Sequence, residues 1–380
     1  MNIPRFLSVA VATLAATAAA SATTRYVSAS GADTGNCSSS PCRTIQYAVN
    51  QSGSGDTINV SSGTYAETVS VTKQLTLIGS PNLNNNGDTH GNLGGGNATL
   101  NAAGFDKGFV ISGAGSAGTV LRGFTVENAG QEGIFAVQTS NLTISGNTVI
   151  NNDAYGPNSP QCPATNADDC GEAIHLQSVT NSTVTSNMVQ HNVGGILLTD
   201  ENGPTSGNLI SYNQVLNNTK DCGITLASHF FHLGAPVAPG AGGVYQNTVL
   251  NNTSNNNGAA GIGVFAGPPG GAAWGNTVVG NTARNNGLPG LAVHSHSPFQ
   301  NVNNNVFLSN TVSNNGPDDD AGTGAPAGVV VWSAVVPILN TTVMNNTIIA
   351  EYYGIYTRNA TIVGISSNNI SPSVKVPISQ

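Results

Sequence analysis

The feature that most constrains the fold of this chain is an internal repeat. Residues 121–137 and 144–156 align as apolar, any, Gly, any, Thr-Val, any, Asn, at a spacing of about two dozen residues. The same phrase returns further along the chain as TSNMVQHN, SYNQVLNN, YQNTVLNN, WGNTVVGN, LSNTVSNN and MNNTIIAE. A regular spacing of this length predicts a solenoid, in which each repeat packs on its two neighbours.

A second short run accompanies the repeats. Each run begins with Gly, or once with Ala, and alternates between apolar and other residues, which is typical of a β-strand. The runs are GIFAVQ (133–138), AIHLQS (173–178), GILLTDE (195–201), GITLASH (223–229), GIGVFAG (261–267), GLAVHSH (290–296), GVVVWS (328–333) and GIYTRN (354–359). The Asn, Gly and Ser residues between runs accept the left-handed backbone of tight corners.

Three short strands per repeat predict an all-β fold, a single-stranded right-handed parallel β-helix solenoid. Inward Ile, Val and Leu would form columns, and corner Asn side chains would stack in hydrogen-bonded ladders. Leucine-rich repeats lack the alternation, and propeller blades are longer. The 47 glycines and the 6% of aromatic residues agree with a chain of short strands and turns.

A helical cap is expected to cover the first coil, at about residues 36–53. Ser40 can cap a helix, Pro41 suits its first position and Gly53 suits its end. The stretch that follows, GDTINVSSGTYAETVSVTKQLTLIG, resembles the opening coils of the secreted right-handed β-helix repeat proteins of the pectin-lyase-like superfamily. The resemblance extends from Thr24 nearly to the end of the chain. It implies the fold, and it implies as a first expectation the cleavage or epimerisation of acidic polysaccharides.

The first 22 residues have the pattern of an export signal: Arg5, then an apolar stretch, then the small residues Ala20–Ala22. The alternative is a membrane anchor at this end, and no later stretch is apolar enough to cross a bilayer. We expect one domain, residues 23–380, in a secreted or periplasmic protein. The expected disulfide bonds join cysteines that are close in sequence, Cys37 with Cys42 and Cys162 with Cys170. The fifth cysteine, Cys222, is expected to be a buried small side chain.

Aligning the runs on their first residue predicts which side chains face outward. Positions two, four and six places on point away from the core, and neighbouring coils lie roughly 4.8 Å apart. This alignment gathers ionisable residues on one face of one sheet. The catalytic candidates are His229, Glu201, Asp200, Asp221, His294 and His296, and the substrate-binding candidates are Lys220, Trp332, Arg358 and His175.

Three insertions interrupt the repeat, at about residues 153–172, 230–243 and 316–326. Insertions in solenoids tend to lie on the binding face, so these loops are expected to wall a groove, with inert decoration as the alternative. Asp318–Asp320, in the third loop, are expected to be solvated rather than to bind a metal.

Several kinds of chemistry are compatible with these residues. A lyase needs a cation beside the substrate carboxylate (Arg358 or Lys220) and a base (His229 or His294). A glycoside hydrolase needs two carboxyl groups, available among Asp200, Glu201 and Asp221. The motifs of polygalacturonases, pectate lyases and mannuronan epimerases are not intact, so no catalytic role carries over from them.

Two further alternatives involve no catalysis. One is a carbohydrate-binding or adhesive solenoid, and the other is a periplasmic metal-binding β-helix in which His294, His296 and His229 are the ligands. No cofactor is required, although calcium or another divalent metal would help a long anionic substrate to bind. We expect the protein to be a monomer and its partner to be a polysaccharide. Nucleic acid is excluded, because the net charge is -8 and only ten residues are Lys or Arg.

Overall fold

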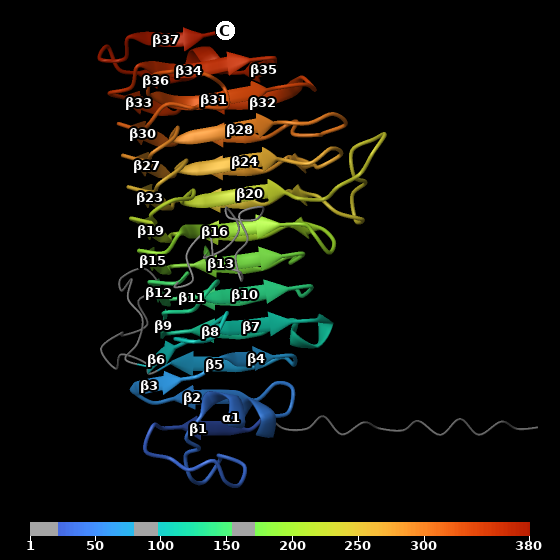
Figure 1. Cartoon of the computed structure of the whole chain (residues 1–380), viewed down its shortest axis with the longest axis vertical. Helices are drawn as coiled ribbons and strands as arrows, with labels where there is room; N and C mark the ends of the chain where they lie inside the picture. Colours follow the sequence, from blue (N-terminus) through green and yellow to red (C-terminus); the bar gives the residue numbers. More distant parts are fainter. Residues whose placement is uncertain (1–21, 80–97, 154–171) are drawn as a thin grey trace, which may run out of the picture.

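The chain winds into a stack of coils, and each coil contributes one short strand to each of three parallel sheets. The structure is a computed structural model that describes residues 22–79, 98–153 and 172–380. Figure 1 shows the coils stacked from β1 at the N-terminal end to β37 at the C-terminal end. The predicted right-handed parallel β-helix is therefore confirmed.

The three long sheets, here named A, B and C, follow one another in that order along each coil. Within the described residues, sheet A consists of β1 (Thr24–Val27), β2 (Thr57–Val60), β5 (Thr76–Gly79), β8 (Val120–Arg122), β11 (Thr143–Ser145), β14 (Thr183–Thr185), β18 (Leu209–Ser211), β22 (Thr248–Leu250), β26 (Thr277–Val279), β29 (Val306–Leu308), β32 (Ile338–Met344) and β35 (Ala360–Val363). Sheet B, in the same part of the chain, consists of β3 (Gly63–Ala66), β6 (Ala98–Asn101), β9 (Phe124–Glu127), β12 (Thr148–Ile150), β15 (Met188–Gln190), β19 (Gln214–Leu216), β23 (Thr253–Asn255), β27 (Thr282–Arg284), β30 (Thr311–Ser313), β33 (Thr347–Ile349) and β36 (Asn369–Ile370).

Sheet C has the longest strands in the middle of the stack. Where the structure describes the chain, it consists of β4 (Val69–Val71), β7 (Phe109–Ser112), β10 (Ile134–Val137), β13 (Glu172–Gln177), β16 (Gly194–Thr199), β20 (Ile224–Ser228), β24 (Ile262–Ala266), β28 (Leu291–Ser295), β31 (Ala327–Ser333), β34 (Tyr353–Arg358) and β37 (Val376–Ser379). A small fourth sheet joins sheets C and A in three coils, through β17 (Thr205–Ser206), β21 (Val244–Tyr245) and β25 (Ala273–Trp274).

Aliphatic columns fill the interior, as the alternation predicts. One column of sheet C is in register from coil to coil and is buried throughout: Ile134, Ile174, Ile196, Ile224, Ile262, Leu291, Val329 and Ile355. Most of the buried apolar residues form one continuous cluster from Val27 to Val374. Each coil buries its inward side chains only by stacking on its neighbours, so stability is shared along the solenoid.

Asparagine ladders hold the corners between the sheets. In the ladder between sheets A and B, each buried side-chain amide donates to the side-chain oxygen of the Asn in the next coil, and the ladder ends on Asn368. The donors are Asn147, Asn187, Asn213, Asn252, Asn281, Asn310 and Asn346. The residue before such an Asn takes left-handed backbone, for example Ser186 at φ 55° and Asn251 at φ 53°. The predicted ladders are confirmed, and Asn succeeds there because its amide both donates and accepts.

The cap helix, α1 (Ile45–Gln51), begins later than predicted. Its N-cap is Thr44, whose side chain accepts from Tyr47 N, so the assignment of Ser40 as the cap is wrong. The reason is that Cys42 is still paired with β1, donating to Tyr26 O and accepting from Ser28 N. The carboxylate of Glu67 completes the start of the helix by accepting from Ile45 N and Gln46 N.

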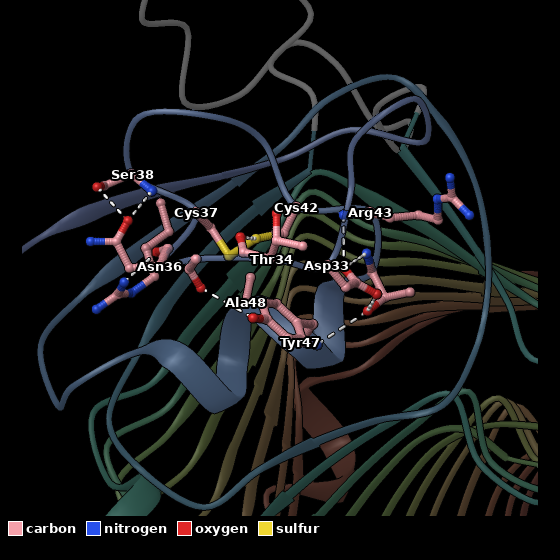
Figure 2. The surroundings of a disulfide bond; sticks show 12 residues. Asp33, Thr34, Asn36, Cys37, Ser38, Cys42, Arg43, Tyr47 and Ala48 are labelled. Atoms are coloured by element: carbon pink, nitrogen blue, oxygen red, sulfur yellow. Dashed lines mark hydrogen bonds between the residues drawn. A yellow bond between two sulfur atoms is a disulfide. The ribbon is translucent and has the colours of Figure 1, made fainter.

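The disulfide bond between Cys37 and Cys42 is confirmed. Figure 2 shows it together with Asp33, whose carboxylate accepts from Arg43 N and Thr44 N and so fixes the turn that enters the helix. The signal segment 1–22 falls almost wholly outside the described residues, as do Cys162, Cys170 and nearly all of the loop 153–172. Among the helices that are described, none has the length and apolarity to span a membrane.

Candidate functional site

The outward columns of sheet C have the register that the sequence predicts, but several of their members are buried. Phe135 pairs with His175, His175 with Leu197, and Leu197 with Thr225. The expectation that the outward side chains face solvent is wrong for His175, Leu197, Thr225, Ala292 and Val330 in this column. It is also wrong for Thr199, Ala227 and His294 in the next column. The turns before the strands fold over this face and cover it, for example where Ala321 packs on Val330.

A cavity of about 420 Å³ lies on this face, between β16 and the loop before β31. Its floor is the outer surface of sheet C, and one wall is the row of turns that precede the strands. The residues that line it are Leu197, Lys220, Asp221, Cys222, Thr225, Ala227, His229, Ala259, Ala260, Phe265, Gly267, Leu288, Pro289, Ala292, His294, His296, Asp318, Asp319 and Asp320. Its volume is within the range of small-molecule sites. A smaller hollow of about 250 Å³ lies beside the cap, where the carboxylate in its lining, Glu67, is used by α1.

His229 and Glu201 meet at the end of β20, as their equivalent positions on adjacent coils predict. His229 Nδ1 lies 2.8 Å from Glu201 Oε1, and the side chains are 25% and 30% exposed. Burial tends to raise the pKa of Glu201, but the hydrogen bond with His229 and the charge of that imidazole outweigh it and lower the pKa to about 2. The carboxylate is therefore ionised at neutral pH and orients the ring.

Asp200 lies behind the cavity and does not line it. Its carboxylate accepts from Ser228 Oγ at 2.9 Å, from His229 N at 2.8 Å and from the backbone N–H groups of Phe230 and Gly243. Burial raises its pKa against these hydrogen bonds. The carboxylate thus joins the two ends of the loop 229–243, a positioning role in place of the predicted catalytic one.

A second group of ionisable side chains lies at the other end of the cavity. His294 Nε2 is 2.9 Å from Asp318 Oδ2, and His296 Nε2 is 3.3 Å from Asp320 Oδ2. Asp318 is buried, so the expectation that all three aspartates are solvated is wrong for this one. Burial would raise the pKa of Asp318, but its contact with His294 lowers it. Trp332 on the next coil lies against both imidazoles, at ring distances of 5.4 and 5.5 Å.

The remaining predicted site residues divide into two groups. Lys220 and Asp221 line the cavity, and Cys222 beside them is buried as expected, so burial raises the pKa of its thiol well above the usual value. His175 and Arg358 are outside it. His175 is buried between Glu132 and Thr199, so its side chain does not reach the cavity where its contact with substrate was predicted. Arg358 is exposed one coil beyond Trp332.

Of the insertions expected to wall a groove, 316–326 lines the cavity through Asp318–Asp320, and 230–243 does not line it. Sequence reasoning did not assign these aspartates, Phe265 or Leu288 to the site. The aspartates lie in the insertion 316–326, directly before the sheet C strand β31, and this position was the signal that could have found them. A loop that leads into a strand of sheet C can fold over the outer face of the preceding coil and place its side chains there. Phe265 precedes His294 in the same outward column, and the two rings lie 5.3 Å apart.

The family model for the right-handed β-helix region matches residues 54–307, which is more than half of the chain. The chain therefore belongs to this family of right-handed β-helix proteins. A search of curated protein sequences gives no significant match.

Solved structures are similar in fold at low sequence identity. The A-module of the mannuronan C-5 epimerase AlgE4 from Azotobacter vinelandii is 16% identical with a TM-score of 0.59, over 88% of this chain and 92% of that one. The pectate lyase Pel9A is 14% identical with a TM-score of 0.53, over 92% and 80%. The Dettilon tailspike protein is 15% identical with a TM-score of 0.52, over 88% and 63%. At these identities the likeness establishes the fold and leaves the activity open.

Proposed function

We propose that this protein cleaves a polysaccharide in the cavity on the outer face of sheet C. The observation that carries the proposal is that one cavity of about 420 Å³ brings together an oriented imidazole, a lysine, carboxylates and an aromatic side chain. These are the groups that carbohydrate chemistry uses for proton transfer, charge compensation and stacking. The names of the epimerase and the pectate lyase of similar fold support a polysaccharide as the substrate.

His229 is assigned the proton-transfer step. When its Nδ1–H donates to the ionised carboxylate of Glu201, the basic lone pair of the ring is on Nε2. An imidazole held in this way can take a proton from water or from a substrate carbon. Glu201 is the positioning residue of the pair, because it fixes the tautomer and the direction of the ring.

The charges that line the cavity favour hydrolysis of a weakly charged glycan over elimination on a uronate. Four carboxylates face one lysine there: Asp221, Asp318, Asp319 and Asp320 against Lys220. A substrate with many carboxylates would be repelled by this wall. In the hydrolytic reaction His229 takes the proton of the attacking water as the glycosidic C–O bond breaks. Asp221 or Asp319, whichever of the two holds a proton when the substrate binds, gives it to the departing oxygen.

Lys220 is the observation that favours the second candidate, a lyase. Its ammonium group is the cation that could neutralise a substrate carboxylate beside the base. In that reaction His229 takes the C5 proton, the C4–O bond breaks, the departing oxygen takes a proton from water, and a 4,5-unsaturated uronate is the product.

A screen of the purified protein against pectins, alginates and neutral glycans tests the proposal. New reducing ends without ultraviolet absorbance indicate hydrolysis, and reducing ends together with unsaturated uronates indicate elimination. Retention on a glycan matrix without cleavage would indicate a carbohydrate-binding or adhesive solenoid in place of an enzyme. No product from any glycan, together with no retention on any glycan matrix, would contradict the proposal.

Export is part of the proposal, because a polysaccharide of this kind is an extracellular substrate. The signal pattern at residues 1–22 supports it, and so does the disulfide bond between Cys37 and Cys42, since such bonds persist in oxidising compartments. Fractionation of expressing cells is expected to recover the chain, shortened to begin near Thr23, outside the cytoplasm. Recovery of the full-length chain with reduced cysteines in the cytoplasm would contradict it.

A further inference from the structure

His294, His296 and Asp320 lie in the arrangement of ligands around one metal ion. Asp320 Oδ2 is 3.3 Å from His296 Nε2 and 3.8 Å from His294 Nδ1, and one ligand atom from each residue can be chosen so that all lie within 4.8 Å of one another. Ligands bound at about 2.0–2.2 Å in a tetrahedron lie about 3.3 Å apart. Small side-chain rotations would therefore bring the three atoms around a single ion.

We propose that these three residues bind a divalent transition metal ion, with Zn²⁺ as the best match. Two imidazoles and one carboxylate are the ligands that zinc and its first-row neighbours prefer. Calcium, which takes six to eight oxygen ligands, does not fit this set. The third ligand is thus Asp320 and not His229, whose ring is engaged by Glu201.

The surroundings of His294 support a built site. Its side chain is only 5% exposed, and Asp318, 2% exposed, lies 2.9 Å from Nε2, on the side of the ring away from Nδ1. A carboxylate in this position fixes the ring and directs Nδ1 toward Asp320, as outer carboxylates do at many metal centres.

Three buried polar atoms of this cluster have ion-pair contacts but no well-formed hydrogen bond. Among the residues that the structure describes, His294 Nε2, His296 Nε2 and Asp318 Oδ2 are buried and make no hydrogen bond of good geometry. Buried polar atoms in native proteins are rarely left so. A metal ion on His296 Nε2, with a proton shared between His294 and Asp318, satisfies all three.

The third ligand leaves one side of the site open. The side chain of Asp320 is 64% exposed and that of His296 is 32% exposed, so water or a substrate oxygen can take the remaining position. Three protein ligands and an open position are typical of metal sites that act on a substrate. The proposal does not rest on polysaccharide cleavage, because the ligand set would bind the ion without any glycan.

Zinc binding to the untagged full chain, stripped with a chelator, tests the proposal by isothermal titration calorimetry. We expect one equivalent to bind. Asp320→Ala and His296→Ala are expected to weaken binding at least 100-fold, and Asp318→Asn about tenfold, as loss of an outer carboxylate does. The matched control is His232→Ala, which removes an exposed histidine whose ring contacts Ala235 O outside the cavity.

Two further measurements keep the result unambiguous. Thermal unfolding in chelator is expected to be the same for Asp320→Ala and the wild type, because this side chain is mostly exposed. Co²⁺ bound to the wild type is expected to give the visible absorption of a four-coordinate ion, and a tenfold excess of Ca²⁺ is expected not to displace Zn²⁺. Absence of zinc binding, binding unchanged by Asp320→Ala and His296→Ala, or displacement by Ca²⁺ would overturn the proposal, whatever the glycan screen gives.

Discussion

Two groups of histidine and carboxylate side chains lie on the outer face of sheet C, and they differ in how their charges are compensated. The first group, here named the ion cluster, lies on the N-terminal side of the cavity and contains Lys107, Glu132, His175 and Thr199. Glu132 contacts both the Lys107 ammonium and His175 Nδ1, and His175 Nε2 lies 2.8 Å from Thr199 Oγ1. A buried carboxylate with a lysine and an imidazole around it is already neutralised by the protein.

The cavity cluster, His294, His296, Asp318 and Asp320, has no lysine or arginine among its described ion pairs. It also borders a cavity, whereas Glu132 and His175 of the ion cluster are buried outside that cavity. Similar residue types on the same sheet therefore differ in charge compensation: Lys107 compensates Glu132 in the ion cluster, whereas the cavity cluster has the proposed metal ion for this role. Mutations in the two regions should separate stability from function.

The largest expected effect is on activity, at the His229 end of the cavity. His229→Ala should lower the cleavage rate at least 100-fold, because a positioned acid–base group contributes about 10²–10⁴. The melting temperature should change little, since no inward side chain is lost. Initial rates on the glycan found by screening, with melting curves, provide the test.

The control for this variant is His191→Asn. His191 is exposed and has a φ of 58°, a conformation that Asn tolerates well, so neither rate nor stability should change. A His229→Ala enzyme with wild-type rate, or a variant that simply unfolds, would contradict the assignment of His229.

The second effect is on stability, in the ion cluster. Glu132→Ala should lower the free energy of unfolding by about 3 kcal/mol, because it leaves His175 and the partly buried Lys107 without their carboxylate. Zinc affinity should stay at the wild-type value. Denaturant unfolding measures the free energy of unfolding, and calorimetry measures the zinc affinity. A loss of zinc binding without a loss of stability would contradict the contrast between the ion cluster and the cavity cluster.

The smallest effect is the pH dependence of that same cluster. Burial tends to raise the pKa of Glu132, but His175 and the Lys107 ammonium outweigh it and lower the pKa below 4.5. Glu172 is the other acidic group near this carboxylate. A lowered carboxyl pKa stabilises the fold above pH 4.5, and this contribution is lost as the pH falls below that value.

Unfolding free energies of wild type and Glu132→Gln at pH 7, 4.5 and 3.5 measure this term. The wild type should be more stable at pH 7 by about 1 kcal/mol or more, as expected when a charged hydrogen-bond partner is removed, and the gap should narrow at pH 3.5. A gap that is constant or widens at low pH would contradict the assigned pKa direction.

The register of the solenoid could be predicted from sequence because a period of two and a glycine at each strand start determine which side chains share a column. This placed His229 beside Glu201 and put Phe265, His294 and Trp332 in one column. The corner ladders followed from the recurring Asn.

Contacts made by irregular backbone could not be predicted in the same way. No repeat sets the path of the loop before β31, so the contact of Asp318 with His294 was missed. The burial of Asp200 depends on four donors near the ends of another loop. Ser40 failed as a cap because a backbone pairing of Cys42 with β1, invisible in local sequence, competes with the helix.

The central claim is that substrate binds in the cavity beside His294 and His296, and Trp332 can report this directly. The chain has two tryptophans, and Trp274 stacks on Tyr245 in the small fourth sheet. In a Trp274→Phe, His229→Ala background, which removes the second fluorophore and prevents turnover, an oligosaccharide of the cleaved glycan should change the Trp332 emission saturably. Unchanged Trp332 emission at an oligosaccharide concentration that saturates binding by calorimetry would contradict the claim.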